Sequence, residues 1–137
     1  MTSCNIFFSK KSDNWSTPKE LYNELNSKWF FDHDPCPLSE DYQGVGLFAN
    51  WGYMNFVNPP YSNIQQFLLT AVSVFHQMGK QSIVLLPSRT DTKWFHEIVL
   101  RYATRVEFIK GRLKFGGSKN TAPFPSMLVY FVNEKGV

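Results

Sequence analysis

The chain places the four residues Asn58-Pro59-Pro60-Tyr61 directly after the apolar run Tyr53 to Val57. Proline has no backbone N–H and a nearly fixed φ, so two successive prolines end a strand in a stiff turn whose carbonyls can accept hydrogen bonds. One interpretation is a rigid turn that only closes the strand. The other is a binding device for a planar amine. The Asn58 side-chain oxygen and the Pro59 carbonyl would accept from one NH2 group, and Tyr61 would stack on the ring that carries it.

The rest of the chain alternates predicted strands with predicted helices. Strands are expected over 30–33, 53–57, 82–87, 106–109 and 127–132. Helices are expected to begin at capping boxes at Thr17 and Ser62 and near Thr90 or Asp91, and Gly79 is expected to end the second helix. This alternation predicts an α/β protein with a mostly parallel sheet and flanking helices.

Composition limits the class of protein. The chain has 137 residues, of which 43% are hydrophobic and 18% charged, and a net charge of +3, which fits a soluble globular protein that tolerates a polyanionic partner. We expect a flexible N-terminus over 1–14 and a single domain over 15–137. Cys4 and Cys36 suggest neither a disulfide framework nor ligand spacing, and the three histidines are scattered, so no metal site is expected. Because no apolar stretch has the length of a signal peptide or membrane span, we expect a cytoplasmic location.

Five segments, in this order, resemble the phage DNA adenine methyltransferase (Dam) family of small N6-adenine methyltransferases. They are Trp15-Ser16-Thr17-Pro18, Phe31-Asp32-His33-Asp34-Pro35-Cys36, Asn58-Pro59-Pro60-Tyr61-Ser62, Leu86-Pro87-Ser88-Arg89-Thr90-Asp91-Thr92-Lys93-Trp94-Phe95 and Gly111-Arg112-Leu113-Lys114-Phe115. The resemblance implies a reduced, Rossmann-like fold that uses S-adenosylmethionine (SAM) as its cofactor. Many SAM-dependent enzymes carry a glycine-rich loop after an acidic residue that corresponds to Asp34, whereas Pro37-Leu38-Ser39-Glu40 follows the Asp-Pro-Cys turn here. The small phage family tends to lack that loop as well.

The resemblance also implies which residues lie beside the cofactor. They are Trp15, Thr17, Pro18, Asp32, Asp34, Pro35, Cys36 and Asn58. Asp34 is the first choice for binding a cofactor donor and Asp32 the second, because a carboxylate at the end of a buried strand is costly unless it is hydrogen-bonded. Structural alternatives stay open for Asp34 as an Asx turn, for Thr17 as a helix N-cap with Pro18 in the first turn, and for Trp15 as a hydrophobic staple.

Positive side chains near a predicted helix start and on a predicted exposed ribbon are candidates for contacts with DNA phosphates. They are Arg89, Lys93, Arg112 and Lys114, and for each the alternative is a solvated surface charge. Arg112 and Lys114 alternate with Leu113 and Phe115, which predicts an exposed two-stranded excursion. The long, glycine-bearing segment 38–52 is expected to form a mobile loop and is the best candidate for a lid.

These features predict an enzyme that uses SAM to methylate the exocyclic N6 amine of adenine in DNA. The adenine would flip onto Tyr61 and be held by Asn58 and the Pro59 carbonyl, in a turn stiffened by Pro60. Two alternatives stay open: methylation of a protein glutamine amide or an RNA base, and a non-catalytic SAM- or DNA-binding module. If phage-encoded, the protein would act in the cytoplasm of a bacterial host. A homodimer would help so short a chain to hold duplex DNA.

Overall fold

The computed structural model describes residues 16–34, 51–116 and 120–133. Its elements are helix α1 (Lys19–Trp29), strand β1 (Met54–Val57), the 3-10 turn η1 (Tyr61–Asn63), helix α3 (Ile64–Met78), strand β2 (Gln81–Pro87), the π-helical turn η2 (Phe95–Val99), helix α4 (Leu100–Tyr102), and strands β3 (Arg105–Phe108) and β4 (Ser126–Phe131). The predicted order of strands and helices is confirmed for all of these elements. No helix in the described part of the chain is long and apolar enough to cross a membrane.

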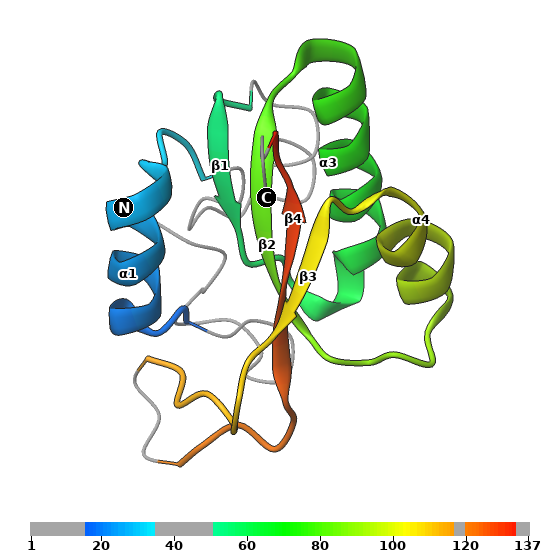
Figure 1. Ribbon diagram of the computed structural model, residues 1–137. Helices are drawn as coiled ribbons and strands as arrows, with labels where there is room; N and C mark the ends of the chain where they lie inside the picture. The colour runs from blue at the N-terminus through cyan, green and yellow to red at the C-terminus, as the bar shows by residue number, and fades with distance from the viewer. Residues whose placement is uncertain (1–15, 35–50, 117–119, 134–137) are drawn as a thin grey trace.

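The four strands form one mixed sheet in the order β1-β2-β4-β3 (Figure 1). β1 and β2 are parallel, whereas β4 is antiparallel to both β2 and β3. The α/β class is therefore confirmed, but the sheet is mixed: three of the described strands share one direction, as a mostly parallel sheet requires, whereas two of the three pairings are antiparallel because β4 is reversed. The apolar runs of β2 and β4 indicate that both faces of these strands are buried, but they do not indicate whether a strand is parallel or antiparallel to its neighbours. Only the return of the chain after β3 decides that β4 enters between β2 and β3.

β1, β2 and β3 all run in the same direction, because β2 and β3 are both antiparallel to β4 and β1 is parallel to β2. Their last residues, Val57, Pro87 and Phe108, therefore lie at the same edge of the sheet, which we call the carboxyl edge. The turn after β1, the segment after β2 and the excursion after β3 all leave from this edge (Figure 1). Ligands of open α/β sheets bind outside such an edge.

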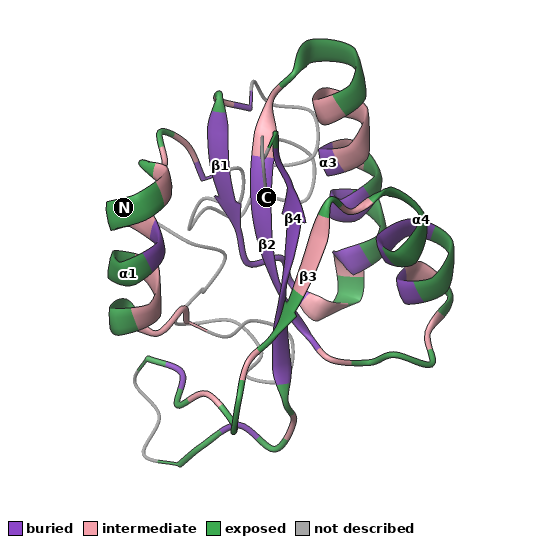
Figure 2. Ribbon diagram, viewed as in Figure 1, coloured by how far each residue is buried: buried purple, intermediate pink, exposed green. Residues whose placement is uncertain are grey.

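Side chains alternate between the two faces of the sheet and form two hydrophobic cores. On one face, Val57 packs with Phe67 of α3 in a core that also includes η2. On the other face, Phe56 packs with Leu25 of α1. β1, β2 and β4 are buried almost throughout, whereas β3, which lies at one edge of the sheet, is partly exposed (Figure 2).

Two of the predicted helix starts differ from the structure. At α1, Pro18 takes the N-cap position with an extended backbone (φ −60°, ψ 130°), and among the described residues no side-chain cap is formed there. The prediction of Thr17 as N-cap is therefore wrong. At α3, Asn63 occupies the N-cap position without a side-chain cap, so the capping box at Ser62 is also wrong. Gly79 ends α3 with φ of 69°, as predicted, because glycine adopts this left-handed conformation without strain.

The strand expected over 30–33 is reduced to a single parallel bridge between His33 and Asn55. Phe30 has φ of 57° and is 74% exposed, because it caps the end of α1 in the left-handed conformation. The chain joins β1 only afterwards, where Asp32 N–H donates to Met54 O at 2.9 Å. This short pairing still carries the chain alongside β1, parallel to it.

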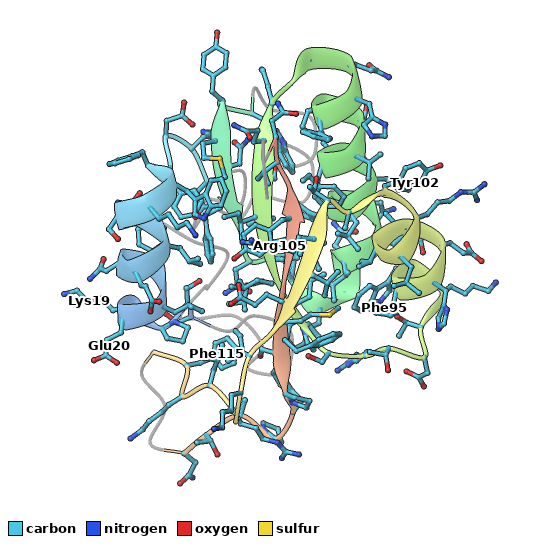
Figure 3. The ribbon with its side chains drawn as sticks, in the orientation of Figure 1. Lys19, Glu20, Phe95, Tyr102, Arg105 and Phe115 are labelled. Carbon is cyan, nitrogen blue, oxygen red and sulfur yellow. The ribbon has the colours of Figure 1, made fainter. Side chains whose placement is uncertain are left out.

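The excursion between β3 and β4 is not the exposed two-stranded ribbon that the alternation predicts. Within it, Ala122 N–H donates to Leu113 O at 2.8 Å, but none of its described residues belongs to a strand. Phe115 is only 3% exposed and belongs to the core beneath α1 (Figure 3). Burial of one large aromatic side chain, rather than strand pairing, therefore anchors this excursion.

Candidate active site

The turn after β1 lies inside the protein. Asn58 is 2% exposed, and Pro59 and Pro60 are buried as well. The Pro60 carbonyl accepts from Asn63 N–H at 2.9 Å and so closes the η1 turn that leads into α3. The Pro60 carbonyl is therefore used within the turn, whereas the proposed amine clamp needs only the Pro59 carbonyl. The turn is thus held at both ends, by β1 and by α3.

The Asn58 side chain is hydrogen-bonded to the segment in front of α1. Its Nδ2 donates to the Thr17 Oγ1 at 2.9 Å. Instead of capping α1, the Thr17 hydroxyl therefore meets the tetrapeptide from 41 positions earlier in the chain. The structure thus brings together Thr17 and Asn58, two residues that the sequence assigns to the site. Local sequence rules had instead predicted that the Thr17 hydroxyl caps the helix that follows it.

Backbone contacts hold the Thr17 segment in place. Gly116 N–H donates to Ser16 O at 3.0 Å, and Tyr22 N–H donates to Pro18 O at 3.0 Å. A Cβ atom on Gly116 would lie 3.0 Å from Ser16 Oγ, so the two segments approach closely because Gly116 has no side chain. The sequence analysis missed this role of Gly116. The only local signal for it is the position of a glycine directly after the aromatic residue Phe115.

Tyr61 lies at the carboxyl edge among other aromatic side chains. Its ring makes an edge-to-face contact with Phe124, with 5.5 Å between ring centres. The guanidinium carbon of Arg89 lies 5.5 Å from the Tyr61 ring centre. Burial raises the pKa of the Tyr61 phenol, an effect that Arg89 opposes in part, so the hydroxyl stays protonated at neutral pH. The sequence analysis missed Phe124, although its position between Pro123 and Pro125 marks a restrained aromatic residue.

Asp32 and Asp34, the two aspartates that follow α1, have different environments. Asp32 is exposed, and its carboxylate accepts from Tyr53 N–H at 3.1 Å and from Met54 N–H at 2.9 Å. It thereby ties the chain to the start of β1. Asp34 is buried, at 9% exposure, and its charge adds to burial in raising the pKa of Tyr22. These environments favour Asp34 over Asp32 as a ligand-binding carboxylate, in the order that the sequence suggests.

The four cationic candidates all follow strands that end at the carboxyl edge. Arg89 and Lys93 follow β2, and Arg112 and Lys114 follow β3. All four are exposed, although Arg89 also contacts Tyr61. The topology therefore places these four charges in segments that leave from the carboxyl edge, although Arg89 and Lys114 are 25 positions apart in the sequence. Trp15, Pro35, Cys36 and most of the lid candidate 38–52 lie outside the described residues.

A separate cavity of about 680 Å³ lies between α1 and β3, and none of the predicted site residues lines it. There the guanidinium carbon of Arg105, which Figure 3 labels, lies over the Tyr130 ring at 4.2 Å from the ring centre. Burial and a hydrogen bond from its hydroxyl to Glu107 raise the pKa of Tyr130 to about 12. The chemistry of the tetrapeptide and the Asp34 carboxylate lies elsewhere, so we place the candidate active site at the carboxyl edge and not in this cavity.

Comparisons with known proteins point to one family. The family model described as DNA N-6-adenine-methyltransferase (Dam) matches residues 6–132. The DNA N-6-adenine-methyltransferase of Haemophilus phage HP1 (strain HP1c1) is 32% identical over 151 residues, which covers 96% of this chain and 84% of that protein. No solved structure matches the chain. The chain therefore belongs to the DNA N-6-adenine-methyltransferase (Dam) family, transferases that methylate adenine in DNA and whose chemistry implies SAM as the methyl donor.

Proposed function

We propose that this protein transfers the methyl group of SAM to the N6 amine of a flipped adenine at the turn Asn58-Pro59-Pro60-Tyr61. The observation that carries the proposal is the buried Asn58 amide, held by its nitrogen at the carboxyl end of β1. A buried amide whose nitrogen is hydrogen-bonded in place is a preorganised group, which is what orientation of a reacting amine requires. The domain that does this would span residues 15–137 and have a Rossmann-like fold.

The Asn58 oxygen and the Pro59 carbonyl would each accept one hydrogen of the adenine amine. With both hydrogens fixed, the nitrogen lone pair is drawn out of conjugation with the ring and points away from the two acceptors. The bound cofactor supplies an electrophilic methyl group. The methylated amine would carry a positive charge and would then lose a proton to water. The contribution of the protein is orientation and exclusion of water.

The residues present fit a SAM molecule at the carboxyl edge. Asp34 is a buried carboxylate on a segment that runs parallel to β1, as shown by the bridge between His33 and Asn55. Asp34 would accept a hydrogen bond from a ribose hydroxyl or from the cofactor's amino group, which offsets the cost of burying its charge. Asn58 and the segment Thr17-Pro18 would form a wall of the same site. Asp32 would support the site indirectly, through its bonds to the start of β1.

DNA would approach the carboxyl edge from the side of the four exposed cations, Arg89, Lys93, Arg112 and Lys114. Their charges would attract phosphates without reading sequence. Tyr61 would then stack on the extruded base. If phage-encoded, the enzyme would act in the cytoplasm of a bacterial host, and a homodimer would extend the surface available to duplex DNA.

Incubation with methyl-labelled SAM and separate DNA, RNA and protein acceptors tests this function. We expect label in DNA and, after digestion to nucleosides, in N6-methyladenine. Asn58→Ala should abolish transfer and leave SAM affinity within a few-fold, because Asn58 acts mainly on the amine whose geometry changes in the transition state. Asn55→Ala is the matched control. Asn55 is a fully buried amide within β1, and among the described residues its side chain bonds only to backbone groups of Gly52 and Gln81.

We expect Asn55→Ala to lower stability but to keep the transfer rate per folded molecule. If the label appears in an RNA base or a glutamine amide, that group and not adenine in DNA is the substrate. Binding of SAM and DNA without any transfer would leave a binding module. Near-normal transfer by folded Asn58→Ala would contradict the proposed mechanism.

A further inference from the structure

β3 forms one edge of the sheet, and one side of its backbone faces no other described strand (Figure 1). Just beyond its end, Ile109 N–H donates to Ser126 O at 3.0 Å, so Ile109 directs its backbone groups toward β4. Backbone groups of successive residues in an antiparallel strand point to opposite sides. Glu107 therefore also bonds toward β4, whereas Val106 and Phe108 direct their N–H and C=O groups outward. In the described part of the chain these outward groups have no hydrogen-bond partner.

We propose that β3 pairs with β3 of a second copy of this chain, antiparallel and around a two-fold axis that passes through Val106. The sheet then continues from one copy into the other, and each Val106 bonds to Val106 of the other copy in both directions. In a two-fold interface the same surface meets itself, so that surface has to be complementary to itself. This inference goes beyond the proposed chemistry and does not depend on it.

The charges of β3 select this register. Around an axis at Val106, Arg105 of one copy lies opposite Glu107 of the other on the same face of the sheet, and the symmetry forms this pair twice. An axis at Glu107 would instead place two carboxylates opposite each other, which destabilises the pairing. The Tyr130 hydroxyl donates to Oε1 of Glu107, so the carboxylate has a second oxygen, Oε2, for a donor from the other copy.

The surface beside β3 has room for a second strand. The cavity of about 680 Å³ lies between α1 and β3, on the face that carries Arg105 and Glu107, because their partners on β4 belong to the core beneath α1. Glu24 and Lys28 of α1 also line this cavity, so both signs of charge occur there. On the opposite face Phe108 is 58% exposed, and the pairing covers part of its apolar surface.

The pairing leaves the proposed active site open. β3 pairs along its side and not at its end, so the carboxyl edges of the two copies stay uncovered and point in opposite directions. Dimerisation and DNA binding therefore use different surfaces. Variants that break the dimer should methylate saturating DNA at within about twofold of the wild-type rate per copy, as expected for independent sites.

The first test measures self-association of the full chain by sedimentation at several concentrations, without SAM or DNA. The wild type should show a monomer–dimer equilibrium. Arg105→Glu and Glu107→Arg should each raise the Kd of the dimer at least about tenfold, because each places like charges opposite each other in both pairs. Arg101→Glu on α4 and Glu97→Arg on η2 are matched controls, because they reverse exposed charges elsewhere, and they should leave the Kd unchanged.

Mixing Arg105→Glu with Glu107→Arg is the sharper test. One copy then has negative side chains at both positions and the other has positive ones, so both cross-strand pairs again join opposite charges. The mixture should form a heterodimer with a Kd within about tenfold of the wild-type value. A role of either residue within its own chain does not predict this recovery, because mixing leaves each chain unchanged. A mixture that stays monomeric would overturn the proposal.

Amide hydrogen exchange tests the strand pairing without any substitution. Val106 N–H should be protected at high protein concentration and exchange faster on dilution, because it is bonded only in the dimer. Glu107 N–H points toward β4 and is the internal control, which should stay protected at both concentrations. A monomeric wild type, or protection of Val106 that does not change with concentration, would overturn the pairing. A dimer that fails to methylate DNA would contradict only the proposed function, so the two proposals fail separately.

Discussion

The guanidinium carbon of Arg89 lies 5.5 Å from the centre of the Tyr61 ring. Both residues are candidates for binding DNA, and the structure places one against the other at the carboxyl edge. A base that stacks on Tyr61 has to share this ring with Arg89 or displace it. We expect displacement, because the exposed guanidinium loses only about 0.5–1 kcal/mol when it leaves an aromatic ring and can bind a phosphate instead.

Arg89→Ala should weaken DNA binding and lower the salt dependence of the binding constant by about one phosphate contact, a slope change of about 0.9. Arg89→Lys should keep most of that slope because it keeps the charge. The matched control is Arg101→Ala, since Arg101 also lies over a tyrosine ring, 5.9 Å from the centre of Tyr102, but on α4. Titrations of DNA at several salt concentrations measure the slopes. Equal slopes for Arg89→Ala and the wild type would show that Arg89 only packs on Tyr61.

Tyr61→Phe should keep most methylation activity, because the aromatic face survives. Tyr61→Ala should lose about 1–3 kcal/mol of base binding. The loss should shrink when the target adenine lies opposite a mismatch, because a weakly paired base is easier to extrude. Methylation rates on matched and mismatched duplexes check this, once thermal stabilities have been compared. Equal losses for both variants would indicate a role for the hydroxyl, and unaltered rates would exclude base stacking.

The two aspartates should separate binding from stability. Asp34→Ala should weaken SAM binding by one to two decades, because a hydrogen bond to a charged group contributes about 1.5–3 kcal/mol. Asp32→Ala should leave SAM affinity within a few-fold and lower the free energy of unfolding by about 1–3 kcal/mol, because the backbone amides of Tyr53 and Met54 lose their acceptor. Calorimetric titration and urea unfolding measure these effects. An unchanged SAM dissociation constant in Asp34→Ala would show that Asp34 only shapes its turn.

Protein stability should fall as the pH is lowered below about 6.5. Burial lowers the pKa of His33, with Asp32 opposing the shift, and His33 Nε2 has no hydrogen-bond partner among the described residues. Below the unfolded-state pKa of about 6.5, the unfolded chain binds more protons than the folded one, so the free energy of unfolding decreases until the pH reaches the folded pKa. Urea unfolding between pH 5 and 8 should show this slope in the wild type and a smaller one in His33→Gln. Identical slopes would assign the pH dependence to other groups.

Much of the fold follows from local sequence. The apolar runs that became β1, β2 and β4 are strands in the structure because they can bury both faces, and Gly79 ends α3 because it tolerates a positive φ. The order of strands along the chain places Asn58-Pro59-Pro60-Tyr61 at the end of β1. These features depend on neighbours within a few residues, so they can be predicted from the sequence without a structure.

The tertiary structure decided how these pieces meet. Nothing within a few residues of β4 specifies that it inserts between β2 and β3 in the antiparallel direction, since its apolar side chains fit either direction. The same holds for Thr17. Its position before a helix favours a cap, but its hydroxyl bonds to Asn58 because the folded chain brings a buried amide within 2.9 Å. A hydroxyl bonds to whichever partner lies within reach in the folded state, and for contacts far apart in sequence only the packing of the whole domain determines that partner.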